Sequence, residues 1–257
     1  MANVVSDIAY WNRLAPRFES EVFHVLANDQ RRIIAREIAR VADPTATAVD
    51  LGCGNGRAIP LLARQFARVV GVDLSPALIE RARRATRRLP NVELLAADLM
   101  TPPPGIPPAC LVLSINAILA PDDTIMRTLV RRIADYTAPG GQALVVVPAL
   151  ESMLLAGLVA CEWTRRSPSR RARVARRSVL ANIGAGAGAG AGAMRVGGTI
   201  TRHFSRAALT AELAGVGLRV RRLERVEYAW TTEFRDPPRW MRGAYPFDWL
   251  AVADQSD

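Results

Sequence analysis

The chain has 257 residues, half of them hydrophobic, and a formal net charge of +10 at pH 7. This length and composition predict one large domain whose core is covered on both faces, and they exclude a disordered chain. Three widely spaced cysteines argue against a disulfide framework or a zinc site. We find no secretory signal and no apolar run of about 18 residues, the length that a membrane-spanning helix needs, so we expect a cytoplasmic protein.

The basic charge is concentrated in one segment. The chain contains no lysine, and seven arginines fall close together with no acidic residue among them: Arg165, Arg166, Arg170, Arg171, Arg173, Arg176 and Arg177. They account for most of the net charge. The rest of the chain is therefore near neutral, and the basicity belongs to one segment.

The N-terminal segment, from Ser6 to about Val41, is predicted to be helical. Apolar residues recur there at helical spacing: Ile8, Trp11, Leu14, Ala15 and Phe18, then Ile33, Ile34, Ile38 and Val41. We expect residues 1–45 to form a helical cap on the domain.

A glycine-rich turn follows this cap. The apolar run Thr47–Val49 predicts a buried parallel strand, and the apolar spacing after Arg57 predicts a helix to about Ala67. Between them residues 50–56 read Asp-Leu-Gly-Cys-Gly-Asn-Gly. Glycine adopts positive φ without strain and lets a ligand approach the backbone, so the turn predicts a ligand site.

Two classes of ligand use such a turn. Dinucleotide-binding enzymes use Gly-x-Gly-x-x-Gly and place a pyrophosphate at the start of the helix, but here Arg57 stands at the third glycine position. Asp50 would also repel a pyrophosphate, whereas it suits a ligand that carries an ammonium group and a sulfonium. A second strand, residues 69–73, ends in Asp73 about 20 residues beyond the turn, where an acid can hold ribose hydroxyls.

Strands and helices continue to alternate as far as Pro148. Ser75-Pro76 is a helix start signal, with serine as the N-cap. The third, fourth and fifth strands are predicted at residues 91–96, 110–115 and 142–147, and a helix that begins at Asp122-Asp123 separates the last two. Regular alternation predicts a parallel sheet with helices on both faces.

These motifs together closely resemble those of the class I S-adenosylmethionine-dependent methyltransferases. The resemblance covers roughly residues 8–150, and it rests on Asp50 with its three glycines, on Asp73, on Ala96-Ala97-Asp98-Leu99 and on Pro139-Gly140-Gly141. It implies an α/β fold: a doubly wound, Rossmann-like, seven-stranded sheet with a C-terminal antiparallel hairpin and a helical insertion after the fifth strand. Residues 46–150 would be the cofactor-binding core of a single domain, residues 1–257.

The resemblance also implies a cofactor, S-adenosyl-L-methionine, and the positions that bind it: Tyr10, Asp50, Gly52, Cys53, Gly54, Gly56, Asp73, Leu74, Asp98, Leu99 and Asn116. In this family the acid at Asp98 accepts a hydrogen bond from the adenine amino group, and Asn116 follows the strand beside the transferable methyl group. Trp11 is an alternative to Tyr10. We find no cluster of His, Asp and Glu at metal-ligand spacing and expect no metal.

Residues 151–198 are predicted to be an insertion. Residues 151 to about 178 read as one helix, first apolar and then arginine-rich, and alternating glycine and alanine at 184–193 predicts a flexible loop. Three interpretations of residues 153–177 remain open: a lid over the acceptor pocket, a helix in peripheral contact with a membrane, and a nucleic-acid-binding arm. Only Trp163 accompanies the charges, which disfavours the third interpretation.

The C-terminal part, residues 199–257, is expected to resume regular structure at Thr199. A helix that begins after Ser205 and strands at 218–228 and 249–253 are predicted. Seven aromatic residues gather here, and they either wall a pocket for a flat or apolar acceptor or pack the hairpin or a dimer contact: Tyr228, Trp230, Phe234, Trp240, Tyr245, Phe247 and Trp249.

The sequence assigns no catalytic residue, and the candidates that it offers are His203, His24 and Asn116. Methyl transfer depends mainly on positioning, and it needs a base only when the nucleophile arrives protonated. Nucleic-acid amino methyltransferases carry Asn/Asp-Pro-Pro-aromatic where this chain has Ser114–Ala117, which argues against a nucleic-acid substrate.

We therefore predict methyl transfer from S-adenosylmethionine to a small organic acceptor through an oxygen, nitrogen or carbon nucleophile. The alternatives are an NAD(P)-type oxidoreductase and a non-catalytic cofactor-binding or scaffold protein. Neither the acceptor nor the oligomeric state follows from the sequence.

Overall fold

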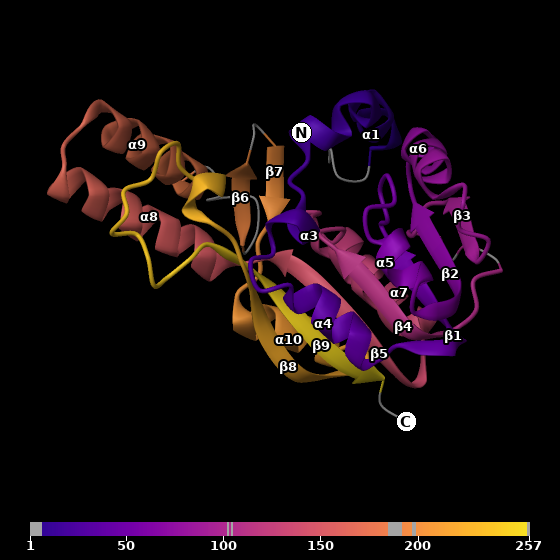
Figure 1. Cartoon of the computed structure of the whole chain (residues 1–257). Helices are drawn as coiled ribbons and strands as arrows, with labels where there is room; N and C mark the ends of the chain where they lie inside the picture. Colours follow the sequence, from indigo (N-terminus) through magenta and orange to yellow (C-terminus); the bar gives the residue numbers. More distant parts are fainter. Residues whose placement is uncertain (1–6, 102, 104, 185–191, 197–198, 256–257) are drawn as a thin grey trace.

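The structure, a computed structural model, describes residues 7–101, 103, 105–184, 192–196 and 199–255. Seven of its strands form one sheet (Figure 1): β1 (Asp43–Leu51), β2 (Phe66–Asp73), β3 (Val92–Ala96), β4 (Ala109–Ile115), β5 (Thr137–Pro148), β8 (Leu218–Glu227) and β9 (Phe247–Gln255). Their order is β3-β2-β1-β4-β5-β9-β8. The first five strands are parallel, and β9 is antiparallel to both β5 and β8. The predicted seven-stranded sheet with a C-terminal antiparallel hairpin is confirmed.

Helices cover both faces of the sheet. On one face α7 (Asp123–Tyr136) and α10 (Arg206–Ala214) bury Met126, Val130 and Leu209 against the strands. On the other face lie α4 (Ile33–Arg40), α5 (Ile59–Ala63) and α6 (Pro76–Thr86), in a second apolar cluster. Along β2, Val69 belongs to the second cluster and Val70 to the first, because successive strand residues point to opposite faces.

The N-terminal cap is helical but broken into short pieces. Before α4 it contains α1 (Ile8–Leu14), a 3₁₀ turn at 15–17, α2 (Phe18–Glu21) and α3 (Val25–Asn28). Pro16 lacks the amide hydrogen that would continue α1, which explains the first break. The Asn12 Oδ1 accepts hydrogen bonds from Ser75 Oγ at 2.6 Å and Ala77 N at 3.3 Å, so α1 is tied to the start of α6.

The helix after the glycine turn is shorter than predicted. It spans only Ile59–Ala63, and Phe66 already belongs to β2. Ile59 and Leu62 are fully buried beneath the sheet, as the helical pattern required. Phe66 fitted the same period because it is also buried, but as a strand residue. The apolar period was therefore correct about burial and wrong about where the helix ends.

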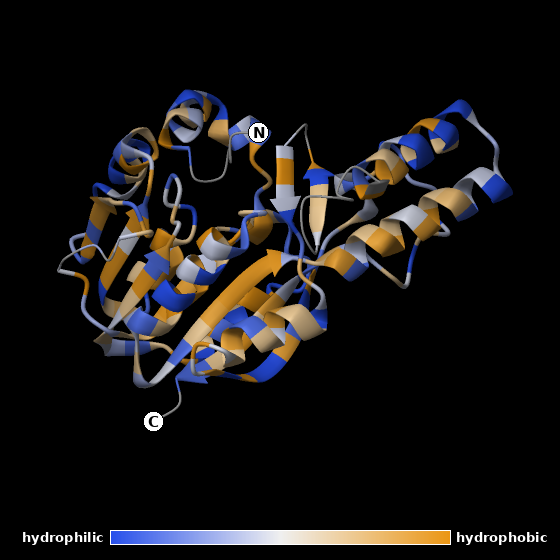
Figure 2. Ribbon diagram, turned by 180° about the vertical axis from the view of Figure 1, so that it is seen from behind, coloured by the Kyte–Doolittle hydropathy of each residue, from blue (hydrophilic) through white to orange (hydrophobic). Residues whose placement is uncertain are grey.

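The insertion is a hairpin of two helices rather than the one helix predicted. α8 (Leu150–Arg166) and α9 (Arg170–Gly184) are separated by residues 167–169. Pro168 disfavours a helical conformation at the residue before it, and Ser169 Oγ then accepts from Ala172 N at 3.2 Å to begin α9. In Figures 1 and 2 the hairpin extends away from the sheet, and its outer end is hydrophilic.

The base of the hairpin packs against the loop between β8 and β9. The Trp230 ring stacks on Phe234 with ring centroids 5.4 Å apart, and Trp163 of α8 meets Phe234 edge-on at 5.9 Å. Trp163, Trp230 and Phe234 therefore pack the base of the helical hairpin, a contact that the sequence interpretations did not include.

Regular structure resumes earlier than Thr199. β6 (Ala193–Val196) pairs antiparallel with β7 (Thr199–Arg202) in a separate two-stranded sheet. The predicted flexible loop falls mainly on residues 185–191, which lie outside the described residues. In the part of the chain that is described, no helix is long and apolar enough to cross a membrane.

Candidate functional site

The glycine turn lies where β1 ends, and all three of its glycines lie close to other segments. All three have positive φ: 79° at Gly52, 56° at Gly54 and 86° at Gly56. A Cβ on Gly52 would lie 2.4 Å from the Cβ of Ala117, which follows β4, and one on Gly54 would lie 2.9 Å from Cζ of Phe18. Any side chain here would therefore disturb both the turn and the segments packed on it.

Two acidic side chains stand beside the turn at the ends of adjacent strands. Asp73 Oδ2 accepts from Gly54 N at 2.8 Å, and Oδ1 accepts from Ser75 N at 2.9 Å. Asp50 is only 2% exposed, and no described residue donates a hydrogen bond to its carboxylate. Burial, together with the neighbouring charge of Asp73, raises the pKa of Asp50 to about 7. Such a carboxylate lacks a cation, which a positively charged ligand would supply.

Burial also raises the pKa of Asp73, against the effect of its two backbone hydrogen bonds. The Asp98 loop starts beside this residue, because Ala97 N donates to the Asp73 carbonyl at 2.9 Å. Asp98 is exposed and accepts from Met100 N at 2.9 Å, and Leu99 is half-buried. The predicted acids thus follow neighbouring strands at one edge of the sheet.

The other predicted positions have varied surroundings. Leu74 and Tyr10 are half-buried, and the Tyr10 ring meets Trp11 edge-on at 5.2 Å in α1. Cys53 is buried within the turn, where burial raises the pKa of its thiol and keeps it protonated. The turn therefore presents backbone rather than a reactive thiolate.

Sequence reasoning missed how the N-terminal cap is held on the turn. Arg57 donates to the carbonyls of Phe18, Val22 and Phe23 at 3.1–3.3 Å and forms an ion pair with Glu19 at 2.9 Å. Its guanidinium also lies 4.8 Å from the centroid of the Phe18 ring. The sequence marked Arg57 only as a departure from the dinucleotide pattern, whereas the structure makes it the anchor of the cap.

A small pocket of about 70 Å³ lies near this edge of the sheet, at the ends of β5 and β8 and the start of β9. It is lined by Pro148, Ala149, Ser152, Met153, His203, Tyr228, Glu233, Phe247 and Asp248. Asn116 connects it to the glycine turn: Asn116 follows β4 next to Ala117, and its Nδ2 donates to Asp248 Oδ2 at 3.1 Å. The Tyr228 hydroxyl donates to the same oxygen at 2.7 Å.

Asp248 is the second residue that sequence reasoning missed. It is 8% exposed, and burial raises the pKa of its carboxyl while the two donors oppose the rise. The one available signal was an acid between two aromatic residues at the start of a mainly apolar run. Asn116, a predicted residue, has φ of 49° and a buried Oδ1 with no hydrogen-bond partner among the described residues.

The two histidines differ sharply. His203 lines the pocket and is 7% exposed, and its Nδ1 has no hydrogen-bond partner in the part of the chain that the structure describes. Burial lowers the pKa of His203 to about 4, against a smaller opposing effect of the Thr201 backbone. His24 instead caps α3, where its Nδ1 accepts from Ala27 N at 3.2 Å. The structure therefore brings His203 to the pocket and leaves His24 with a structural role.

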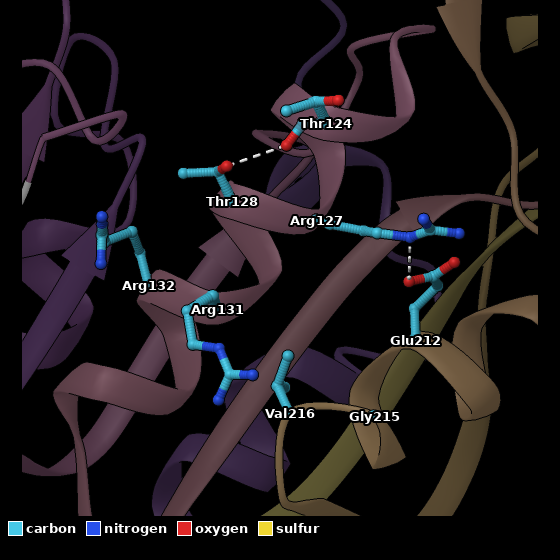
Figure 3. Close-up of a pocket in the computed structure, with 8 residues that line it drawn as sticks. All are labelled: Thr124, Arg127, Thr128, Arg131, Arg132, Glu212, Gly215 and Val216. Atoms are coloured by element: carbon cyan, nitrogen blue, oxygen red, sulfur yellow. Dashed lines mark hydrogen bonds and ion pairs between the residues drawn. The ribbon is translucent and has the colours of Figure 1, made fainter.

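A larger hollow of about 550 Å³ lies between α7 and α10 (Figure 3). An ion pair between Arg127 and Glu212, at 3.4 Å, joins the two helices there. Its lining residues come from these helices and from residues 215–216. It lies outside the edge where the parallel strands end, which is where ligands bind in sheets of this kind, so we place the site at the smaller pocket and the glycine turn.

This strand order, with the glycine turn after the first strand and an acid after each of the next two, defines the fold of the class I S-adenosylmethionine-dependent methyltransferases. Residues 48–141 match the family described as "Methyltransferase domain". The crystal structure of the N-methyltransferase NodS from Bradyrhizobium japonicum in complex with S-adenosylhomocysteine has a TM-score of 0.60 at 14% identity, covering 96% of this chain and 99% of that one.

Two relatives named trans-aconitate 2-methyltransferase are similar in sequence. The relative from Azoarcus sp. is 34% identical over 52% of this chain and 51% of its own length. The relative from Methylobacterium radiotolerans is 37% identical over 55% of this chain and 50% of its own length. The chain thus spans about half the length of these two relatives.

Proposed function

We propose that the protein transfers the methyl group of S-adenosylmethionine to a small organic acceptor. The observation that carries this proposal is the buried Asp50 carboxylate, which has no hydrogen-bond donor among the described residues and stands beside three glycines of positive φ. When bound, the sulfonium supplies an activated methyl group: the acceptor's lone pair bonds to the methyl carbon as the carbon–sulfur bond breaks, leaving S-adenosylhomocysteine, and the acceptor's proton is released to solvent.

The residues fit the parts of this cofactor. Asp50 would hold the ammonium group, and Asp73 the ribose hydroxyls, because each carboxylate oxygen can accept a second hydrogen bond beyond those from Gly54 and Ser75. Asp98 and Leu99 would hold the adenine. The turn, with Cys53, would supply close backbone approach, and Leu74, Tyr10 and Asn116 would complete the surroundings.

The proposal is tested at Asp73. We expect Asp73→Ala to weaken binding of S-adenosylmethionine by ~1.5–3 kcal/mol, the cost of losing charged hydrogen bonds to two hydroxyls. Isothermal titration calorimetry measures the loss. Asp73→Asn keeps the size and one acceptor oxygen, so we expect a smaller loss. Unchanged affinity in a folded Asp73→Ala protein would show that the ribose lies elsewhere.

An NAD(P)-type oxidoreductase and a non-catalytic scaffold are the alternatives. The acidic pair at Asp50 and Asp73 opposes a pyrophosphate, which carries negative charge. Calorimetry with NAD and with S-adenosylhomocysteine tests the oxidoreductase alternative. We expect heat of binding from S-adenosylhomocysteine and none from NAD. Formation of S-adenosylhomocysteine from S-adenosylmethionine in the presence of an acceptor would exclude the non-catalytic scaffold.

The names of the two relatives specify trans-aconitate, a tricarboxylate. We do not extend this acceptor to the chain, because the matched family domain ends at residue 141 and the pocket residues begin at Pro148. No arginine is among the residues that line the pocket in the described part of the chain, and a tricarboxylate needs cationic partners. We also propose a cytoplasmic location, supported by three free cysteines.

The arginines at the outer end of α8 lie far from the pocket. Met153 of α8 lines the pocket, whereas Arg165 lies about 18 Å further along the helix axis at 1.5 Å per residue. Arg165 and Arg166 pair with Glu162, and Arg171 lies 3.3 Å from Asp236. The lid interpretation therefore applies to the beginning of α8, and the arginines remain available for a peripheral membrane contact.

We expect replacement of the seven arginines by glutamine to leave the affinity for S-adenosylhomocysteine unchanged. The physical reason is their distance from the glycine turn and the pocket. Co-sedimentation with vesicles of anionic lipid tests the membrane interpretation. Vesicle binding by the native chain that is lost in the variant supports this interpretation, and equal vesicle binding by both proteins contradicts it. A duplex affinity that falls steeply with salt would instead favour a nucleic-acid arm.

A further inference from the structure

Several hydrogen-bond acceptors around the small pocket are left unpaired, beside the Ser152 hydroxyl, which accepts from Phe247 N and has a proton to donate. Asn116 Oδ1 and His203 Nδ1 are buried without a partner among the described residues. Asp248 receives its two hydrogen bonds on Oδ2, and no described residue donates to Oδ1. The Asn116 amide nitrogen must face Asp248, since two oxygens there would repel each other, and this leaves its oxygen unpaired.

These acceptors require a ligand that brings donors. A buried acceptor without a partner costs free energy, so a ligand with N–H or O–H groups would gain by meeting these atoms. A carboxylate has only acceptors and would leave them all unpaired. His203 stays neutral at physiological pH, because burial lowers its pKa to about 4, and it therefore offers no positive charge to an anion.

The charge of the pocket points the same way. Two carboxyl side chains, those of Asp248 and Glu233, are among the lining residues, and no arginine is. Arg225 lies over the rings of Phe247 and Trp249, 4.6 Å and 5.8 Å from their centroids, and does not line the pocket. Arg202, next to His203, is turned to the carbonyls of Ala120 and Pro121.

We infer that the pocket selects an amine as the methyl acceptor and rejects carboxylates. The inference rests on the proposed methyl transfer and specifies its substrate class. The ammonium form of an amine carries donors for Asn116, His203 and Asp248, and its positive charge meets the negative charge of Asp248. One of its protons passes to the Asp248 carboxylate before methyl transfer, because only the neutral amine has the lone pair that bonds to the methyl carbon. A volume of about 70 Å³ has room for a few water molecules, so it accommodates the reacting head of the acceptor, and Tyr228 and Phe247 are among the lining residues.

Three probes that share a ring and differ in the head group test this selection: benzylamine, benzyl alcohol and benzoate. Calorimetry is run on the full chain, with and without saturating S-adenosylhomocysteine. We expect benzylamine to bind at least ~10-fold more tightly than the alcohol and benzoate to show no heat of binding. Equal affinity for the amine and the alcohol, tighter binding of benzoate, or no binding of benzylamine overturns the inference.

A variant without the Asp248 charge, and a matched control, test whether Asp248 causes the preference for the amine. Asp248→Asn keeps the size of the side chain, and we expect it to reduce the preference for benzylamine over benzyl alcohol by ~10-fold. Glu212→Gln removes one negative charge at the hollow between α7 and α10 and should leave the preference unchanged. A preference that survives in folded Asp248→Asn, or that falls equally in both variants, contradicts the assignment.

Two further measurements complete the test. The first uses the native chain, so it does not depend on whether a variant folds, and the second distinguishes failure of the inference from failure of the proposed function. In the native chain, raising the pH through the pKa of benzylamine should weaken its binding, because the neutral amine loses its attraction to Asp248; a constant affinity overturns the inference. Failure of S-adenosylhomocysteine to bind, with amine selectivity intact, refutes the proposed methyl transfer alone. Binding of S-adenosylhomocysteine without amine selectivity refutes only the inference.

Discussion

Asp50→Asn is expected to make the ligand-free protein more stable at pH 8 while weakening its binding of S-adenosylmethionine. The carboxylate is buried without a hydrogen-bond donor among the described residues, so in the absence of a ligand its charge destabilises the fold. The amide is uncharged and of nearly equal size. The same charge is what a cationic ligand would bind, and the substitution removes it.

The pH dependence follows from the direction of the shift. The pKa of Asp50 is raised from 3.8 to about 7, so between these values the folded chain holds a proton that the unfolded chain has released. The free energy of unfolding therefore falls as the pH rises through this window. The stability gained by Asp50→Asn should grow over the same window and level off above pH 7, at up to about 4 kcal/mol for a shift of this size.

Urea unfolding of the native and variant proteins between pH 4 and 8 measures this difference. Glu80→Gln, which alters an exposed acid on α6, is the control and should show no such dependence. Binding supplies a second readout: a cation beside Asp50 lowers its pKa, so binding near pH 6.5 should release a proton in the native chain and none in Asp50→Asn. Calorimetry in buffers of different ionisation enthalpy detects that proton. Equal stability curves would show that Asp50 is not charged in the ligand-free fold.

The parallel half of the fold was predictable because its signals are local. The apolar strand before Asp50, the glycines after it and the acid at the end of β2 each combine a period with a turn residue, and their order specifies a parallel sheet. The end of α5 was misplaced because burial alone cannot distinguish a helix residue from the first residue of the next strand. Phe66 is such a residue.

The pocket was less predictable because its residues are distant in sequence. Asn116 and Asp248 are 132 positions apart, and they meet only because β9 inserts between β5 and β8. The sequence offered His203 and His24 as equal candidates, and the fold separates them, because His203 lines the pocket and His24 caps α3. Arg57 likewise acquires its role through Phe18 and Glu19, about 35–40 positions earlier on a cap whose helices are individually short.

The largest loss of function is expected from the smallest change in the glycine turn. In Gly52→Ala the new Cβ would lie 2.4 Å from Ala117 Cβ, a distance at which one segment must move. Ala117 cannot turn its methyl away, because a Cβ is fixed by the backbone, so the turn or the end of β4 must shift. We expect a loss of about 2–4 kcal/mol in the free energy of unfolding, from the positive φ and the overpacking together. We also expect binding of S-adenosylmethionine to be lost.

Gly140→Ala separates the two causes. Gly140 has φ of 71°, close to the 79° of Gly52, but a Cβ there would meet nothing within 4 Å. It should lose only the roughly 1–2 kcal/mol that a left-handed backbone conformation costs a residue with a Cβ, and it should bind S-adenosylmethionine as the native chain does. Chemical unfolding and calorimetry measure both effects. Equal losses of stability and binding in the two variants would mean that backbone strain alone explains the effect of Gly52→Ala. The larger loss that we expect in Gly52→Ala would instead show that the turn depends on its contact with the segment that carries Asn116.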